Sequence, residues 1–235
     1  DVQDSLFLYQ LEHLCFNLTP EQFAATIRYE IPQNIPLAGC FNTAGRQLTA
    51  ADLSADLDAR YRFLYGVYEK LNGTLPLEAV LTTKEYLDFK TKMLVLMRYA
   101  VTVCLTDLSQ SVCTGMTRAE LDRLAELNID AALTEDIQQY TLTSPKSAAG
   151  KAGQVQAAYR KGIRLQPEIQ GLFRCLERHG ITPYICSASQ EDGVRVFACT
   201  PKYGYCLKPE QVFGRRRIPD ASGRFTDERD YSIPQ

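Results

Sequence analysis

The chain has 235 residues, a formal net charge of −2 and 23% charged residues. This near-neutral balance gives no electrostatic case for binding nucleic acid or an anionic membrane, because such proteins usually present a basic face. A hydrophobic content of 45% is typical of soluble globular proteins, and the length allows one large or two small domains. No apolar run reaches the roughly 18 residues of a membrane span, so we expect none.

The first part of the chain predicts amphipathic helices. Residues 2–18 place Phe7 and Leu11 on one face of a helix, and the helix 20–30 begins at a Thr19-Pro20 capping signal. Prolines end that helix, and residues 31–48 are expected to form a loop. Further helices are expected over 49–73 and 83–105, and Thr117 and Glu120 have the spacing of a capping box. We therefore expect a helical domain over 1–145, with no convincing strand before residue 140.

Residues 146–153 are rich in Gly, Ala and Lys and are expected to form a flexible linker. The two glycines and two lysines invite comparison with a phosphate-binding loop. The spacing Gly-x-x-x-x-Gly-Lys-Ser/Thr is not met, so that interpretation is rejected.

After the linker, residues 154–235 alternate between helix and strand patterns, which indicates an α/β domain. A helix is expected from Pro167 to Gly180, followed by a short buried strand over 184–186. Ser187-Ala188-Ser189 would then turn into another helix. Short strands are expected at 211–214 and 224–226 around a turn at 219–223, with Arg215-Arg216-Arg217 on a solvated strand edge.

The Ser187-Ala188-Ser189 turn is the candidate binding site. In parallel α/β folds ligands bind at the carboxyl ends of strands, and hydroxyls and free N–H groups at a helix start suit an anion such as phosphate. Small residues after a strand also form ordinary tight turns, so local chemistry leaves both readings open.

The sequence contains eight cysteines but no Cys-x-x-Cys and no close Cys/His spacing typical of zinc sites. Cys199 and Cys206 flank a short loop and form the plausible short-range disulfide pair. Four cysteines occupy apolar helical or strand positions, where a free thiol behaves as a small hydrophobe: Cys15, Cys104, Cys175 and Cys186. We expect mostly free thiols, which favours a reducing, cytoplasmic location over export.

Two stretches carry a resemblance to a known family. Tyr184-Ile-Cys-Ser-Ala-Ser189, preceded by residues 159–168, resembles the second motif of haloacid dehalogenase (HAD) superfamily phosphatases, in the phosphoserine and phosphorylcholine phosphatase branch. The first twelve residues resemble the segment that follows the first motif of that branch. The resemblance implies an α/β Rossmann-like core and a large helical cap domain.

In that family an aspartate attacks the phosphate, a second aspartate two residues later acts as general acid and base, and Mg²⁺ bridges carboxylate and phosphate. The resemblance implies that Ser187 binds a phosphoryl oxygen, with the N–H groups of Ala188 and Ser189 as further donors. It also implies that Asp1 grips the ammonium group of a small phosphorylated metabolite.

The chain departs from the family pattern because it contains no Asp-x-Asp-x-Thr/Ser motif. The resemblance places the nucleophilic aspartate just upstream of Asp1, and the third and fourth motifs beyond Gln235. We therefore expect no catalytic or metal-binding residue of the mechanism within the chain, and no phosphatase activity from these residues alone. Two alternatives remain: a catalytically inactive binding or interaction protein, and a phosphotransferase of the same superfamily.

Overall fold

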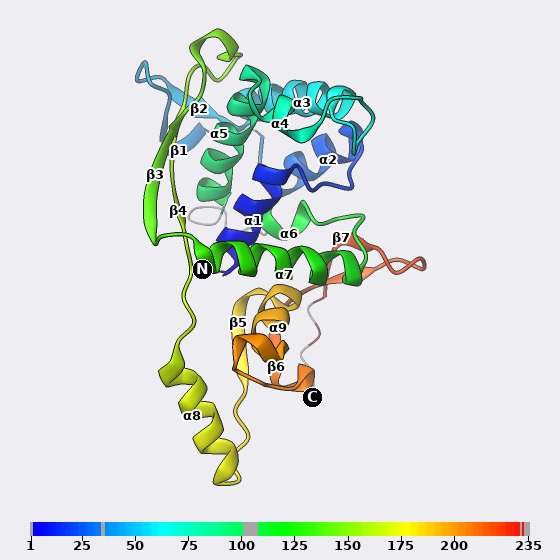
Figure 1. Cartoon of the computed structure of the whole chain (residues 1–235). Coiled ribbons are helices and arrows are strands. Elements are labelled where there is room, and N and C mark those ends of the chain that lie inside the picture. Colours follow the sequence, from blue (N-terminus) through cyan, green and yellow to red (C-terminus); the bar gives the residue numbers. More distant parts are fainter. Residues whose placement is uncertain (1, 34–35, 101–107, 231, 233–235) are drawn as a thin grey trace. The chain divides into compact units, whose positions relative to one another are not determined.

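The computed structural model describes residues 2–33, 36–100, 108–230 and 232, in which helices alternate with small sheets (Figure 1). In chain order the elements before residue 136 are α1 (Val2–His13), α2 (Pro20–Glu30), β1 (Pro36–Phe41), β2 (Gln47–Thr49), α3 (Ala50–Val67), α4 (Leu77–Leu81), α5 (Lys84–Tyr99), α6 (Leu108–Ser111) and α7 (Arg118–Thr134). The later elements are β3 (Gln138–Thr143), β4 (Gln156–Lys161), α8 (Pro167–Arg178), β5 (Ile185–Gln190), α9 (Glu191–Cys199), β6 (Val212–Pro219) and β7 (Phe225–Asp230), with single 3₁₀ turns between them. Within the described residues, no helix is both long and apolar enough to cross a membrane.

The chain folds into two compact units. The sheet unit contains Asp1–Tyr9, Cys113–Gln138 and Lys161–Gln235, and the helical unit contains Gln10–Val112 and Gln139–Arg160. This division differs from the expected one at 145 and 154. Helix α7 belongs to the sheet unit, and the segment 146–153, expected as a linker, lies within the helical unit.

The helical unit is built around an aromatic core. Phe23 and Tyr61 stack with ring centroids 4.1 Å apart, and Phe16 packs edge-on against Tyr61 and Phe89. The buried Tyr61 hydroxyl donates to the Leu18 carbonyl at 2.8 Å, and burial raises the pKa of this phenol. The expected capping box at the start of α2 is confirmed, because Thr19 and Gln22 bond each other's backbone N–H groups.

Several boundaries in the helical unit differ from the sequence expectations. Helix α1 ends at His13 rather than residue 18, because Leu14 has a positive φ of 49° that a helix does not allow. Residues 31–48 are not a plain loop, since β1 and β2 pair antiparallel there. Strand β3, paired with β4, also begins before residue 140. The expected end of the second long helix at 105 lies outside the described residues.

A buried ion cluster fixes the segment 146–153 inside the helical unit. Lys92 is fully buried, and its Nζ lies 2.8 Å from both Asp56 Oδ2 and Asp88 Oδ1. The same ammonium donates to the Ala149 carbonyl at 2.8 Å, while Asp56 accepts from the backbone N–H groups of Lys151 and Ala152. These bonds explain why the Gly/Ala-rich stretch is an ordered part of the unit.

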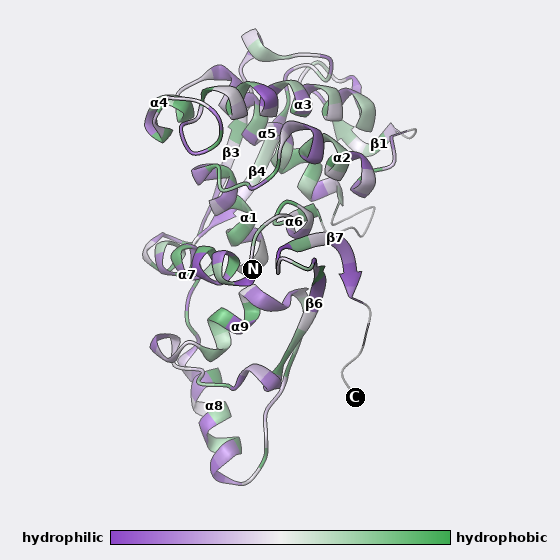
Figure 2. Cartoon of the chain, turned by 90° about the vertical axis from the view of Figure 1, so that its right-hand side faces the viewer, coloured by the Kyte–Doolittle hydropathy of each residue, from purple (hydrophilic) through white to green (hydrophobic). Residues whose placement is uncertain are grey.

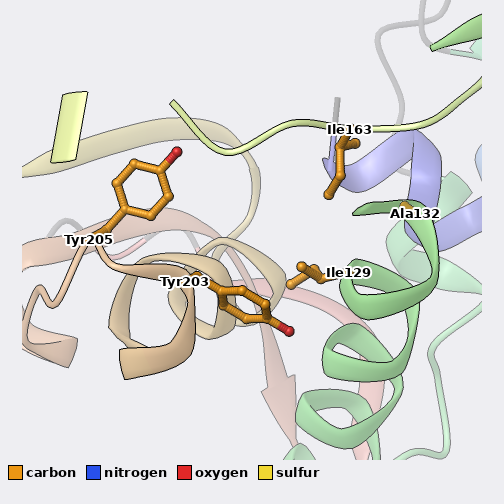
Figure 3. Close-up of a cluster of buried hydrophobic side chains, with 5 residues drawn as sticks. All are labelled: Ile129, Ala132, Ile163, Tyr203 and Tyr205. Atoms are coloured by element: carbon orange, nitrogen blue, oxygen red, sulfur yellow. The ribbon is translucent and has the colours of Figure 1, made fainter. Parts of the chain in front are cut away.

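The sheet unit has its apolar core beside α7. Thr117 and Glu120 form the predicted capping box that starts this helix. Figure 3 shows the buried cluster of Ile129, Ala132, Ile163, Tyr203 and Tyr205, in which Tyr203 projects toward α7. The Tyr203 hydroxyl donates to Asp130 at 2.9 Å, which satisfies its polar end.

The three-stranded sheet has the order β5-β6-β7. β5 and β6 pair in parallel, as expected for an α/β arrangement, and α9 connects them. β6 and β7 form an antiparallel hairpin, whose turn is stabilised by the Asp220 carboxylate accepting from the N–H groups of Ser222 and Arg224. The strand expected at 211–214 is therefore the beginning of a longer strand that contains the arginine triplet.

Two burial expectations for this sheet were wrong. Tyr184 is 59% exposed and Cys186 is also exposed, so the strand expected to be buried lies at the sheet's edge within the described part of the chain. Arg217, expected on a solvated edge, is buried and donates to the Asp227 carbonyl of β7. The triplet is therefore not uniformly solvated: Arg215 is exposed, Arg216 is half-buried and Arg217 is buried.

Candidate functional site at the end of β5

The expected Ser187-Ala188-Ser189 turn is a bulge within β5. Ile185 and Cys186 pair with Val212 and Phe213, but the next pair joins Gln190 to Arg215. Three residues of β5 therefore face a single residue of β6, and α9 begins only at Glu191. The expectation that the two serines form a turn outside the strand was therefore wrong, because both lie within β5. Bulges of this kind re-aim side chains next to functional sites.

The bulge is held by a bond between its own serines. The Ser189 N–H donates to Ser187 Oγ at 3.1 Å. Because a serine hydroxyl carries one proton and two acceptor lone pairs, Ser187 still has its own O–H to donate. The N–H of Ser189, expected as a further donor to an anion, makes this bond within the bulge. Ser187 is half-buried, whereas Ala188 is exposed.

Ser187 lines an open depression of about 350 Å³ in the sheet unit. Its lining residues are Cys186, Ser187, Glu191, Phe213, Gly214, Arg216 and Ser232. The predicted Ser187 therefore shares the depression with one acidic side chain, Glu191, and one basic side chain, Arg216. Sequence reasoning missed these two residues, because Glu191 lies beyond the motif and Arg216 was assigned to a solvated triplet.

The charged groups of the depression are tied to one another. Arg216 Nε lies 3.6 Å from Glu191 Oε2 and 3.6 Å from Asp230 Oδ2, and Arg216 Nη2 donates to the Ser232 carbonyl at 2.7 Å. Glu191 also accepts from the Gly214 N–H at 3.2 Å. This network fixes the guanidinium beside the bulge but neutralises part of its charge.

A second ion cluster anchors the start of α9. The buried Asp192 lies 2.9 Å from Arg195 and 3.1 Å from Arg118, so its carboxylate holds α9 against α7. Arg195 also lies 3.1 Å from Asp122, whose pKa is raised by partial burial. Because α9 follows the bulge directly, these ion pairs position Ser187 without contacting it.

Two further parts of the expected site are the substrate-binding Asp1 and a site for Mg²⁺. Asp1, expected to bind the substrate's ammonium group, lies outside the described residues. No group of three or more His, Cys, Asp or Glu side chains in the described part of the chain is arranged to hold a metal ion. The depression contributes Glu191, which is already bonded to Gly214 and faces Arg216. The described residues therefore do not fit Mg²⁺ by themselves.

The cysteines add no site here. Each of the seven described cysteines carries a free thiol, and the pair Cys199 and Cys206 is not bonded. Burial raises the pKa of the Cys15, Cys40 and Cys199 thiols, which lowers their reactivity as nucleophiles.

Comparison with known proteins gives a short sequence match and a long structural one. A stretch of 43 residues is 46% identical to phosphorylcholine phosphatase from Pseudomonas aeruginosa and covers 18% of this chain and 12% of that protein. A crystal structure of a conserved protein of unknown function from Anaerococcus prevotii matches with a TM-score of 0.90 and 28% identity. No family model matches the chain.

The match to the solved structure covers 98% of this chain but only 61% of that chain, so this chain spans about three fifths of its solved relative. The fold is thus shared with a longer protein of unknown function, and a short part of the sequence is similar to a phosphatase.

Proposed function

We propose that the chain is part of a phosphomonoester hydrolase of the HAD type, in which Ser187 donates its hydroxyl proton to a phosphoryl oxygen and the Ala188 N–H is a second donor. The observation that carries the proposal is the bulge at the end of β5, which leaves the Ser187 proton free beside a depression containing Arg216. The partial similarity to phosphorylcholine phosphatase supports the same reaction class.

The proposal assigns binding, and not bond cleavage, to these residues. Ser187 has no base among its described hydrogen-bond partners, since its oxygen accepts from the Ser189 N–H. The nucleophilic aspartate, the acid and the ligands of Mg²⁺ would come from parts of a longer protein outside residues 1–235. Ser187 would then stabilise charge on the phosphoryl group as a fixed donor.

For substrate we propose a small phosphate ester that carries a positively charged amine, such as phosphocholine, phosphoethanolamine or phosphoserine. The family resemblance gives Asp1 the role of holding the amine, and a carboxylate there would discriminate against purely anionic sugar phosphates. A substrate panel with Asp1→Asn tests this role in the longer protein. An unchanged preference for amine-bearing esters would contradict it.

The alternative of a non-catalytic binding protein is favoured by one observation. The acidic residue of the depression is bonded to Gly214 and lies beside Arg216, so the described residues offer a binding site without a free carboxylate. A phosphatase assay distinguishes the hydrolase from the non-catalytic binding protein.

The deciding experiment compares residues 1–235 with the longer protein, using a generic aryl phosphate with and without Mg²⁺. We expect Mg²⁺-dependent turnover from the longer protein and none from residues 1–235, whose folding is checked by circular dichroism. Turnover by residues 1–235 would show that this chain contains its own catalytic residues, and it would contradict the assignment of catalysis to other parts of the longer protein. No turnover by the longer protein on the aryl phosphate or the amine-bearing esters would favour the binding function.

A further inference from the structure

Glu191 connects the end of β5 to the neighbouring strand. It follows Gln190, the last residue of β5, and is the first residue of α9. Its Oε2 accepts from the Gly214 N–H at 3.2 Å and lies 3.6 Å from Arg216 Nε, and both of these residues belong to β6. The Glu191 side chain is only 13% exposed, and Figure 2 shows α9 beside β6. One carboxylate oxygen therefore links the start of α9 to two residues of β6.

Gly214 is the residue of β6 that faces the bulge. β6 pairs with β5 through Phe213 before the bulge and through Arg215 after it, so Gly214 alone lies opposite residues 187–189. A bulge disrupts the hydrogen-bonded ladder of a sheet. Because the Gly214 N–H bonds Glu191 at this point, the carboxylate ties β6 to the end of β5 where regular pairing is interrupted.

The bulge depends on its two ends for its position on the sheet. The bond from the Ser189 N–H to Ser187 Oγ fixes the two serines relative to each other, but it does not fix them relative to β6. At the downstream end, the Glu191 carboxylate supplies a side-chain bond to β6 in addition to the backbone pairing. Loss of this bond would therefore let the bulge shift and turn the Ser187 hydroxyl away from its present direction.

The charges around Glu191 favour this position of its carboxylate. Arg216 faces it from β6, and a negative charge in the first turn of a helix is stabilised by the helix dipole. Arg216 is held in turn by Asp230 at 3.6 Å and by the Ser232 carbonyl at 2.7 Å. The bond to Gly214 is the shorter of the two contacts that Glu191 makes with β6. The position of the carboxylate oxygen thus matters more for this link than its charge does.

We propose that Glu191 is a positioning residue, whose bond to Gly214 fixes the bulge so that Ser187 directs its hydroxyl at the phosphoryl group. This role rests on the proposed function, in which Ser187 is the donor. Glu191 acts through Ser187 and does not touch the substrate, since its oxygen is already bonded to the Gly214 N–H. Its removal should therefore cost no more in rate than removal of the Ser187 hydroxyl.

Three variants of Glu191 in the longer protein test the proposal, with an aryl phosphate and Mg²⁺ in the assay. Glu191→Ala should lower kcat/KM by at least about tenfold, since a displacement of about 1 Å in a site can cost roughly 10²-fold in rate. Glu191→Gln keeps an oxygen that accepts from Gly214 and should retain most of the parental rate. Glu191→Asp keeps the charge but is shorter, so it should lose the bond and resemble Glu191→Ala.

The opposite order, with the Asp variant active and the Gln variant slow, would show that the charge acts directly and would overturn the proposal. Circular dichroism at the assay temperature checks that each variant is folded. The comparison of Asp with Gln decides the question even if the Ala variant does not fold. Glu228→Ala is the control, because Glu228 is an exposed acidic residue of the same sheet and its removal should leave the rate unchanged.

A double-mutant cycle with Ser187→Ala separates positioning from a general structural effect. Two residues that act through one donor are not additive, so Glu191→Ala should lower the rate little further once residue 187 has lost its hydroxyl. Fully additive losses would overturn the proposal. A slow Ser187→Ala variant together with parental rates for all Glu191 variants would overturn the role of Glu191 alone. A parental rate for Ser187→Ala would instead overturn the proposed function, and the role of Glu191 with it.

Discussion

The backbone of Gly214 in β6 lies against Glu191 at the start of α9: the Gly214 N–H donates to Glu191 Oε2 at 3.2 Å, and an added Cβ would stand 2.7 Å from Glu191 Cα and from the Ser189 carbonyl oxygen. Both neighbouring atoms belong to the backbone, so they cannot move aside as a flexible side chain would. The absence of a side chain at residue 214 thus permits the bulge that presents Ser187.

Gly214→Ala should therefore destabilise the protein. Overpacking of this kind costs about 1–3 kcal/mol, measured as a loss of unfolding free energy in urea. The control is Gly171→Ala in α8, where no atom lies within 4 Å of an added Cβ. Alanine should stabilise that helix by about 0.5–1 kcal/mol. Equal changes in unfolding free energy for the two variants would contradict the close approach of β6 to α9.

Ser187→Ala should lower kcat/KM of the longer protein on a phosphate ester. Loss of one donor to the transition state costs about 2.7–4 kcal/mol, or roughly 10²–10³-fold in rate. Ser189→Ala keeps the backbone N–H that bonds Ser187 and should reduce the rate much less. If the two variants have equal rates, Ser187 is not the donor.

Lys92→Met should be strongly destabilising, because it leaves the buried Asp56 and Asp88 without their shared cation. Breaking a buried ion pair on one side costs about 3–5 kcal/mol in unfolding free energy. Lys84→Met at the start of the same helix is the control, since Lys84 is exposed and should change stability by less than about 0.5 kcal/mol. Similar losses at both positions would argue against the buried cluster.

The capping box of α7 should make part of the stability depend on pH. Hydrogen bonds from Thr117, the backbone N–H foremost, lower the pKa of Glu120 in the folded protein. A group whose pKa is lowered by folding stabilises the protein above its unfolded pKa, and this stabilisation is lost as the pH falls through the folded value. Glu120→Gln should flatten the decline of the melting temperature in the acidic range.

Thr117→Ala removes the cap itself and should cost about 1 kcal/mol at neutral pH. A melting temperature of Glu120→Gln that declines with acid as steeply as that of the parent protein would show that the carboxylate does not contribute.

Local signals in the sequence predicted where several helices start. Thr19 with Gln22, and Thr117 with Glu120, form the expected capping boxes, and Pro167 starts α8 as predicted. The turn beginning at Asp220 was also predictable. Each of these features depends on residues three or four positions apart, so the interactions that stabilise it are visible in a short window of sequence.

Only the tertiary structure decided the rest, because it depends on residues far apart in the chain. β1 and β2 form by pairing with each other, which neither segment shows by itself. Lys92 is buried because Asp56, on another helix, lies beside its ammonium group. The sequence marked Ser187 as a candidate, but the bulge is set by pairing with β6, which also brings Arg216 beside it. A charged side chain normally lies at the surface, where water solvates it. Its burial becomes favourable only when partners from distant parts of the chain replace that hydration.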